Sequence, residues 1–328
     1  MSSLAPVRVG VAGAGPWGGN VIRACAELGV LAAVCDPDAG RLARAGDGRT
    51  AVFLTRDFDA LLRAVDAVAI AAPASSHAEL ALRAIGAGKH VLVEKPLAMD
   101  VADAQRVADA AEHAGVRAVV GHVLLYHPAV RMLLDAVATG AIGRIVHVRA
   151  RRLNLGRVRA HENVWWSFAP HDVALILALM RSSPTRVAGV AHAVRGVPVA
   201  DFAYADLTFA DERSAHISVS WLDPRRESRL DVFGTSGVLT FEDSRAGARL
   251  VRRPCGVSAS LETWAGDEES IAFDAGAPLE LEIEAFVRAA RDGTATPTDA
   301  RLGVEVVRVL EMVERSARAG APDLAAAR

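Results

Sequence analysis

The 328-residue sequence is short of lysine, because only Lys89 and Lys95 occur among its 37 basic residues. It also has three cysteines, two tyrosines and no apolar run near the roughly 18 residues that a membrane-spanning helix needs. Three cysteines without metal-ligand spacing predict neither a disulfide framework nor a metal site, and they fit a reducing compartment. The net charge of -2 offers no basic surface for nucleic acid or an anionic membrane.

These absences leave an ordinary globular enzyme as the expected class. The chain is 52% hydrophobic and 23% charged, and it is long enough for two domains with cores of their own. Residues 1–6 are too few and carry no charged side chain, so we expect no signal peptide in this stretch. We therefore expect a cytoplasmic protein.

The scarcity of lysine makes Lys95 a candidate acid/base group. It follows an apolar run at residues 90–94 and precedes Pro96. Arginine stays protonated near neutral pH, whereas a partly buried lysine can release its proton. Lys89 shows that a lysine without such a role also occurs, so rarity alone leaves both interpretations open.

A G-x-G-x-x-G motif occupies residues 13–18, between a β-branched run at residues 7–12 and a helical pattern at residues 17–28. Glycines let such a loop turn tightly and approach a pyrophosphate, and the free N–H groups at the helix start bind its charge. The motif therefore predicts that a dinucleotide is bound by Gly13, Gly15, Pro16, Trp17 and Gly18.

An acidic residue follows near the expected distance. The strand-like run at residues 31–35 ends in Asp36, close to the spacing of about 20 residues at which a carboxylate binds the ribose 2′-OH. An aspartate there also repels a 2′-phosphate, so the sequence favours NAD over NADP. The alternative is that residues 36–38 form only a polar turn that caps the next helix.

Strand-like and helix-like segments alternate through the first part of the chain. This pattern predicts a doubly wound parallel sheet with helices on both faces, a Rossmann domain at residues 1–122. The loops after its fourth and fifth strands lie at the edge where such sheets bind ligands. This placement adds four expected cofactor residues: Ala72, Pro73, Glu94 and Lys95.

Two residues of these loops keep alternatives open. His77 either contacts the cofactor or only starts the next helix. X–Pro bonds adopt the cis isomer at little cost, so Lys95–Pro96 could take either isomer.

The second part of the chain has a different pattern. From residue 143 onward, long runs alternate hydrophobic and polar residues, and helical patterns close the chain at residues 279–291 and 302–317. We expect residues 123–328 to form an α+β substrate-binding and oligomerisation domain with a large open antiparallel sheet and flanking helices. We expect a second copy of the chain to cover the open face of this sheet in a dimer.

Residues 154–172 connect the first two strands of that sheet and are dense in polar and aromatic groups. Arg157, His161, Asn163 and two tryptophans suit a polar, sugar-bearing substrate. His171 is expected to open a helix at residues 173–180. The alternative is that it is only an N-terminal helix residue beside a capping aspartate.

Five motifs in this order resemble the Gfo/Idh/MocA oxidoreductases, and they cover nearly the whole chain. They are Gly13-Ala14-Gly15-Pro16-Trp17-Gly18, Glu94-Lys95-Pro96-Leu97, Gly121-His122 with His127-Pro128-Ala129-Val130, Pro170-His171-Asp172, and Phe233-Gly234-Thr235-Ser236-Gly237. The resemblance implies NAD(P)-dependent oxidation or reduction of a hydroxyl or ketone on sugars, inositols or nucleotide-sugars, in a homodimer or homotetramer. It implies Lys95 and His171 as the catalytic pair.

One branch of the family is closest in pattern. Ser167 stands where many members carry an aspartate, four residues before His171, and residues 152–172 look like the branch that oxidises the 3-hydroxyl of UDP-N-acetylglucosamine or its uronic acid. The implied substrate residues are His122, Tyr126, Asn154, Arg157, Asn163, Trp166, Ser167 and Asp172.

The resulting hypothesis is hydride transfer from a sugar C–H, at C3, to NAD. Lys95 accepts or relays the hydroxyl proton, and His171 holds the same oxygen or is itself the base. Three alternatives stay open: an NADPH-dependent ketosugar reductase, a dehydrogenase of a free sugar, inositol or sugar phosphate, and a non-catalytic NAD sensor.

Overall fold

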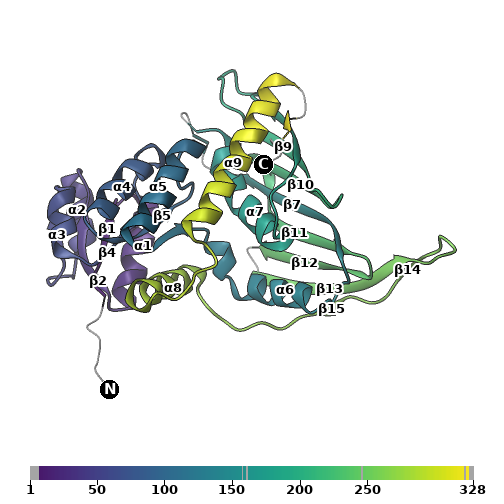
Figure 1. The fold of residues 1–328 in the computed structure, drawn as a ribbon, viewed down its shortest axis with the longest axis horizontal. Coiled ribbons are helices and arrows are strands. Elements are labelled where there is room, and N and C mark those ends of the chain that lie inside the picture. The colour runs from purple at the N-terminus through teal and green to yellow at the C-terminus, as the bar shows by residue number, and fades with distance from the viewer. Residues whose placement is uncertain (1–6, 157, 160–161, 245–246, 321–322, 325–328) are drawn as a thin grey trace. The chain divides into compact units, whose positions relative to one another are not determined.

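A computed structural model describes residues 7–156, 158–159, 162–244, 247–320 and 323–324 of the chain (Figure 1). It divides into two compact units, one of Met1–Tyr126 with Gly276–Val307 and one of His127–Ala275 with Arg308–Arg328. The long helix α9 (Ala300–Ala319) contributes residues to both units. None of the helices in the described ranges has the length and apolar character needed to span a membrane.

The first unit contains a six-stranded sheet in which every neighbouring pair is parallel. Its order is β3-β2-β1-β4-β5-β6. The strands are β1 (Val9–Ala12), β2 (Leu31–Cys35), β3 (Phe53–Thr55), β4 (Ala67–Ile70), β5 (His90–Glu94) and β6 (Ala118–Gly121). The predicted doubly wound sheet is confirmed, and its order reverses between β1 and β4, where such sheets bind ligands.

Helices lie on both faces of this sheet. They are α1 (Pro16–Glu27), α2 (Ala39–Gly46), α3 (Phe58–Ala64), α4 (His77–Gly86), α5 (Val101–Ala114) and α8 (Pro278–Asp292). Val11 of β1 belongs to a buried cluster with Val21 of α1 and Phe286 of α8. Gly10 points the other way, since a Cβ there would lie 2.9 Å from Leu61 of α3. Successive residues of β1 therefore face opposite sides of the sheet, with α1 and α8 on one side and α3 on the other.

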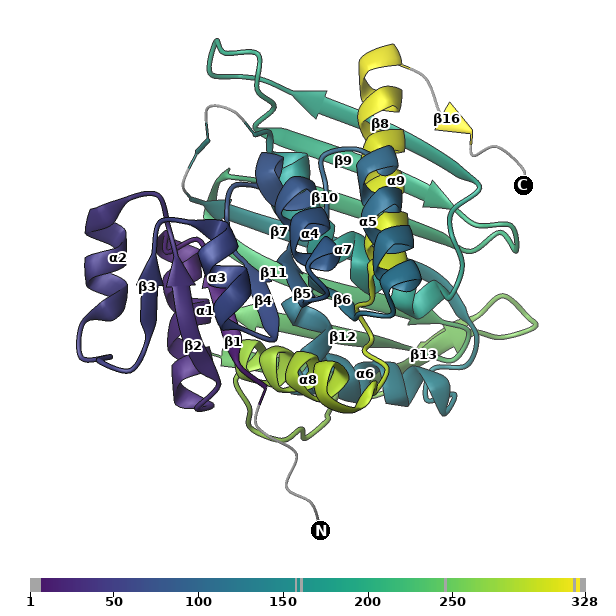
Figure 2. The ribbon, with the colours of Figure 1, turned by 60° about the vertical axis from the view of Figure 1, so that its left-hand side comes forward.

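The second unit is built on a ten-stranded sheet in which β7 (Ile145–Leu155) is central (Figure 2). The other strands are β8 (Arg186–His192), β9 (Phe202–Thr208), β10 (Ser214–Ser220), β11 (Leu222–Gly234), β12 (Gly237–Ser244), β13 (Gly247–Val257), β14 (Thr263–Ala265), β15 (Glu269–Ser270) and β16 (Asp323–Leu324). The large open sheet is confirmed, with one difference. β7 and β10 pair in parallel, whereas every other pair is antiparallel.

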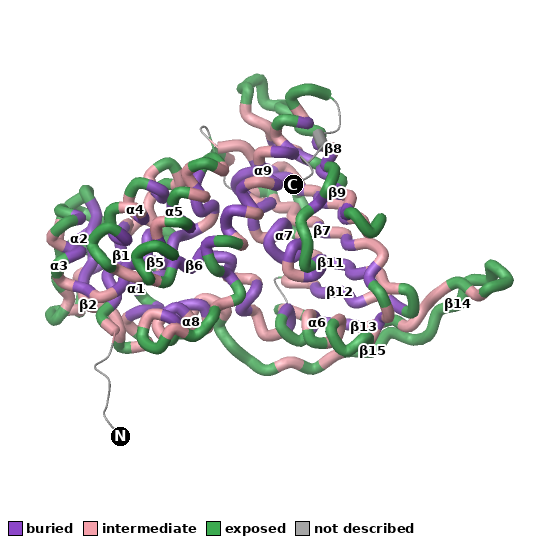
Figure 3. Tube along the Cα trace, in the orientation of Figure 1, coloured by how far each residue is buried: buried purple, intermediate pink, exposed green. Residues whose placement is uncertain are grey.

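Two further helices complete the second unit, α6 (Pro128–Ala138) and α7 (Val164–Met180). The prediction that a helix starts near His171 was wrong, because α7 begins at Val164 and includes Pro170. Asn163 caps its N-terminus by accepting a hydrogen bond from the Trp166 N–H at 3.1 Å, and such a cap stabilises a helix by about 1 kcal/mol. Figure 3 shows α7 as mostly buried, whereas the strands it contacts, β7, β9 and β10, alternate between buried and more exposed residues.

Candidate functional site

The glycine loop between β1 and α1 has the geometry of a phosphate cradle. Gly13 has a φ of 104°, and a Cβ on it would lie 2.5 Å from the carbonyl oxygen of Ala71. A Cβ on Gly18 would lie 2.0 Å from the carbonyl oxygen of Gly13, so only glycine fits at either position. Nothing lies within 4 Å of a Cβ on Gly15, which leaves open space where α1 begins. The loop therefore fits a pyrophosphate bound by the N–H groups of α1.

A cavity of about 540 Å³ opens beside this loop at the strand-order reversal. Asp36 lies at its edge with 2% of its surface exposed, and it accepts hydrogen bonds from the N–H groups of Ala14 (2.7 Å) and Asp38 (2.9 Å). The structure brings seven of the predicted cofactor residues to the lining of this cavity: Gly13, Gly15, Pro16, Trp17, Asp36, Ala72 and Pro73. A concave site with an acidic residue at the end of β2 fits the adenosine half of NAD.

His77 is the first residue of α4 and is almost fully buried. Its Nδ1 lies 2.7 Å from the carbonyl oxygen of Pro96, and its Nε2 lies 2.9 Å from that of Ala72. The ring therefore joins the loops that follow β4 and β5. This contact holds both loops at the edge of the cavity, and His77 also starts α4, which is one of its two expected roles.

Glu94 ends β5 and is buried beneath the glycine loop. Its Oε1 accepts a hydrogen bond of 2.5 Å from the indole N–H of Trp17. Burial raises the pKa of this carboxyl, while the Trp17 hydrogen bond and the charge of Lys95 oppose that shift. The sequence predicted Glu94 as a cofactor residue, and the structure places it behind the loop, where it orients Trp17.

Lys95 follows directly, half-buried, and its peptide bond to Pro96 is cis. His122, at the end of β6, is 1% exposed, and burial together with the charge of Lys95 lowers the pKa of His122 to about 3. The ring is therefore neutral at physiological pH. Tyr126 is also buried, and its hydroxyl lies 2.8 Å from that of Thr298.

Sequence reasoning missed Glu282, which comes from α8 to lie near Glu94. It is fully buried, and neither of its carboxyl oxygens has a hydrogen-bond partner among the described residues. Burial and the neighbouring Glu94 raise the pKa of Glu282 well above its ordinary value. The position is part of a regular helical pattern, so no local pattern marks this glutamate as a residue that faces the core.

In the second unit, α7 carries three of the predicted substrate residues, Trp166, Ser167 and Asp172, together with the predicted catalytic residue His171. Ser167 and His171 are four residues apart on α7, so they share a helix face, and Ser167 is 4% exposed. Trp166 is buried in the first turn. Asn163 caps α7 and also donates to Glu314 at 3.1 Å.

Asp172 is held by an arginine that sequence reasoning did not assign to the site. The guanidinium of Arg152, on β7, donates to both carboxylate oxygens of Asp172 at 2.8 and 2.9 Å and to the Ser228 hydroxyl at 3.2 Å. Only 3% of the Asp172 side chain and 19% of the Arg152 side chain are exposed. This bidentate pair fixes α7 to the sheet one residue beyond His171.

The remaining predicted substrate residues are less informative. Asn154 lies near the end of β7 and is half-buried. Arg157 and His161 lie outside the described residues.

Comparisons with known proteins agree on the family. Residues 7–122 match the model of the oxidoreductase family with an NAD-binding Rossmann fold, and residues 130–240 match the GFO/IDH/MocA C-terminal domain. The chain is 32% identical over 228 residues to UDP-N-acetylglucosamine 3-dehydrogenase of Acidithiobacillus ferrooxidans, covering 68% of this chain and 71% of that protein. It is 39% identical over 142 residues to inositol 2-dehydrogenase 3 of Saccharopolyspora erythraea, covering 42% of each.

The fold agrees as well. The solved structure of the A. ferrooxidans enzyme, GnnA, matches with a TM-score of 0.86 and 26% identity over 96% of this chain and 99% of that one. The glycine cradle, Asp36 and the reversal of strand order account for the Rossmann match in physical terms. The chain therefore belongs to the Gfo/Idh/MocA family of NAD(P)-dependent oxidoreductases, and its first unit carries the NAD-binding domain.

Proposed function

We propose that the protein is an NAD-dependent dehydrogenase that oxidises a secondary hydroxyl, at C3, of a UDP-N-acetylhexosamine. The observation that carries this proposal is the match to UDP-N-acetylglucosamine 3-dehydrogenase, which sequence and structure comparison both return over most of the chain. The polar and aromatic start of α7 supports it, since Ser167 and His171 share one helix face. Bound NAD supplies the hydride acceptor.

In this proposal two side chains divide the work on the reacting hydroxyl. Lys95 accepts or relays its proton, and the neutral ring of His122 adds no second positive charge beside Lys95. His171 holds the same oxygen. Ser167 stands where many relatives carry a carboxylate. In this proposal the transfer of the hydroxyl proton therefore depends on Lys95 and His171, without an acidic side chain at position 167.

The domain boundary and the assembly belong to the same proposal. We propose residues 1–122 as the cofactor domain and residues 123–328 as the substrate and assembly domain, in a homodimer or homotetramer. Arg149 and Arg151 lie on the face of β7 opposite Arg152, which α7 covers through Asp172. A second copy would cover that open face. Light scattering should give two or four times the mass of one chain, and the mass of a single chain would contradict the assembly.

The substrate is tested by following NADH formation with a panel of compounds. UDP-N-acetylglucosamine and its uronic acid should reduce NAD, and UDP alone should inhibit competitively. N-acetylglucosamine, its 1-phosphate and myo-inositol should be poor substrates. If a cyclitol reduces NAD and no UDP-sugar does, the second candidate, which the inositol dehydrogenase relative favours, replaces the first.

The role of Lys95 is tested with the chain's own internal control. Lys95→Ala should lower kcat by about 10²–10⁴-fold while NAD binding, measured by calorimetry, stays within about twofold. Lys89→Ala is the matched control, because Lys89 precedes β5 and donates to the carbonyl oxygen of Val65, whereas Lys95 follows that strand. Normal turnover of Lys95→Ala would contradict the mechanism, and NAD binding without turnover of any panel member would favour the sensor.

A further inference from the structure

A two-stranded ribbon projects from the sheet of the second unit, at the strand labelled β14 (Figure 1). We call residues 254–266 the arm. β12 pairs with β13 only as far as Pro254, and from there residues 255–257 of β13 pair with β14. A two-stranded ribbon on its own is only marginally stable in water. Within the described part of the chain, no third strand supports the arm.

The tip of the arm is a tight turn that presents an apolar side chain. The Ser258 N–H donates to the carbonyl oxygen of Glu262 at 2.8 Å, and the Leu261 N–H donates to that of Ser258 at 3.0 Å. Leu261 has a φ of 64°, a left-handed conformation that is unfavourable for a leucine, and it is 84% exposed. Trp264, on the returning strand, is 49% exposed. Backbone strain together with exposed apolar side chains indicates a binding surface.

The charge of the arm narrows the kind of partner. Glu262 is the only charged residue in the arm, and it follows Leu261 at the tip. Its carboxylate makes no ion pair or hydrogen bond with any described residue. The sequence has no lysine, arginine or histidine between Arg253 and Arg288. The arm therefore fits a surface that combines a basic group with an exposed apolar one.

A basic surface lies at the opposite end of the same sheet. The pairing of β11 with β7 shifts between Leu222 and Glu227, so residues 223–226 have no partner on β7. We call these four residues the β11 bulge. Its Arg225 and Arg226 are exposed, and Arg225 makes no ion pair with any described carboxylate. The bulge therefore offers a guanidinium that lacks a counter-charge in the described part of its own chain.

The bulge also has an apolar neighbour. Leu155 pairs with Leu222 at the edge of the bulge, and 64% of Leu155 is exposed. Leu155 is the last residue of β7, where the segment that holds the proposed substrate residues begins. The tip of the arm, with Leu261 and Glu262, is therefore complementary in polarity and charge to the surface formed by Leu155 and the bulge.

The arm and the bulge of one chain lie far apart. Arg229, three residues after Arg226, is level with Arg249 of β13 through their common neighbour on β12. Pro254 lies five residues beyond Arg249. At about 3.3 Å per residue, these steps place the start of the arm about 26 Å from the bulge, and the arm continues β13 away from it. Contact between arm and bulge therefore needs a second copy of the chain.

We propose that the arm of one copy docks on the β11 bulge of a second copy, with Glu262 paired to Arg225 and Leu261 packed on Leu155. A two-fold axis that reverses the strand direction brings each arm to the bulge of the other copy, so the contact forms twice in a dimer. Each arm then adjoins the start of the other copy's substrate segment. The inference rests on the proposed assembly and does not depend on which sugar is oxidised.

Photo-crosslinking of the full chain tests the contact directly. Benzoylphenylalanine in place of Leu261 should give a product of two chains on a denaturing gel, attached within residues 153–155 or 222–227 by mass spectrometry. The same group in place of Met132, which is exposed on α6 of the same unit, is the matched control and should not attach there. A product joined elsewhere, or within one chain, would overturn the inference.

Charge reversal distinguishes a contact between copies from a contact within one copy. Glu262→Arg and Arg225→Glu should each raise the dissociation constant of the dimer, measured by analytical ultracentrifugation, by about tenfold. A mixture of the two variants should recover the unmodified value, because each contact in the mixed dimer again joins opposite charges. Arg131→Glu, on α6, is the control and should change nothing. Unchanged constants for both variants, or a mixture as weak as either variant alone, would overturn the inference.

The outcomes separate this inference from the proposals on which it rests. A protein of single-chain mass in light scattering would overturn both the docking and the assembly. A dimer whose crosslinks from position 261 fall elsewhere would overturn the docking alone. The expected crosslink in a protein that oxidises no UDP-sugar would support the docking and leave only the proposed substrate contradicted.

Discussion

Glu282 offers a direct test of the packing around Glu94. It is fully buried on α8, and its carboxyl oxygens have no hydrogen-bond partner among the described residues. Glu94 has the Trp17 N–H and Lys95 beside it, and both oppose the rise in its pKa, whereas nothing opposes the rise in the pKa of Glu282, so the carboxyl of Glu282 is the one that more strongly favours its protonated form. An unpartnered polar group in a core costs about 1–3 kcal/mol of folding free energy. Glu282→Met, which is similar in length and apolar, should therefore stabilise the protein by about that amount.

The pH dependence of folding stability shows how much of the cost of burying Glu282 comes from its charge and how much from its polarity. The folded-state pKa of Glu282 lies above its ordinary value of 4.5, so over a range above pH 4.5 the native protein retains a proton that the unfolded chain has released. The contribution of this group to stability is therefore complete below pH 4.5 and is lost as pH rises toward its folded-state pKa. Glu282→Gln has no proton to lose. Its stability relative to the unmodified protein should rise with pH over this range.

Urea unfolding at a series of pH values between about 5 and 8 measures both effects. Glu284→Gln is the matched control, because Glu284 is exposed two residues further along α8 and its change should leave the pH profile in place. A Glu282→Met protein less stable than the unmodified one at neutral pH would refute the reasoning. So would a Glu282→Gln pH profile parallel to that of the unmodified protein.

Three further outcomes follow from the geometry. Gly18→Ala should abolish NAD binding by calorimetry, because its Cβ would clash with the carbonyl oxygen of Gly13; retained affinity would show that the loop is not the cradle. Arg152→Ala and Asp172→Ala should each lower the free energy of unfolding, measured with urea, by about 3–5 kcal/mol. The double variant should lose less than the sum of the two, and additive losses would contradict the ion pair. Asn163→Ala should lower the free energy of unfolding by about 1 kcal/mol in the same assay, and an unchanged value would mean that the cap is dispensable.

The cofactor-binding loop could be predicted from the sequence because its shape requires glycines, whose positions the motif shows directly. Gly13 and Gly18 occupy positions where any Cβ would collide, so the motif itself encodes the geometry. Asp36 follows at a spacing set by one strand and one helix. Strand and helix patterns in this unit were confirmed because alternating apolar runs and aspartate caps such as Asp38 and Asp100 mark element boundaries locally.

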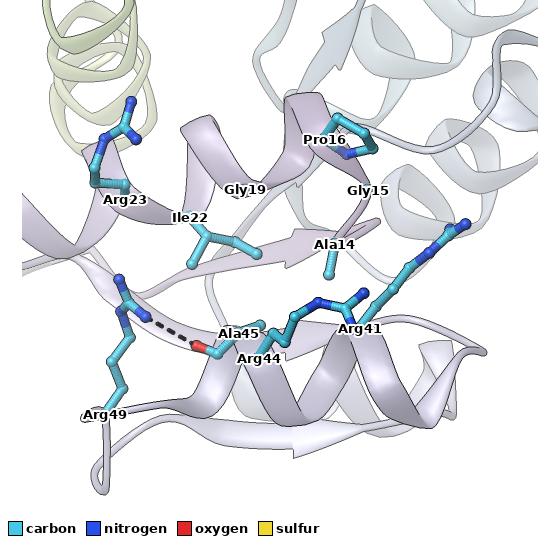
Figure 4. A pocket seen from close by; sticks show the side chains of 10 residues that line it. All are labelled: Ala14, Gly15, Pro16, Gly19, Ile22, Arg23, Arg41, Arg44, Ala45 and Arg49. Atoms are coloured by element: carbon cyan, nitrogen blue, oxygen red, sulfur yellow. Dashed lines mark hydrogen bonds between the residues drawn. The ribbon is translucent and has the colours of Figure 1, made fainter.

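Tertiary contacts account for what sequence reasoning missed. The helix was expected to start near His171, yet α7 begins at Val164 and continues through Pro170, because the Asn163 cap and burial of the helix outweigh one lost backbone hydrogen bond. The parallel pairing of β7 with β10 joins distant segments that no local pattern connects. The arginines on α2 look like an ordinary charged face until the structure shows Arg44 beside the glycine loop (Figure 4).

The most direct test of the proposed function is where the hydride comes from. The enzyme is incubated with NAD and UDP-N-acetylglucosamine carrying deuterium at C3, and the reduced cofactor is analysed by mass spectrometry. Oxidation at C3 predicts one deuterium in the NADH formed and none when the label is at C4. NADH formed without deuterium from the C3-labelled substrate would contradict the assignment of the reacting carbon, and no NADH from any nucleotide-sugar would contradict the substrate class.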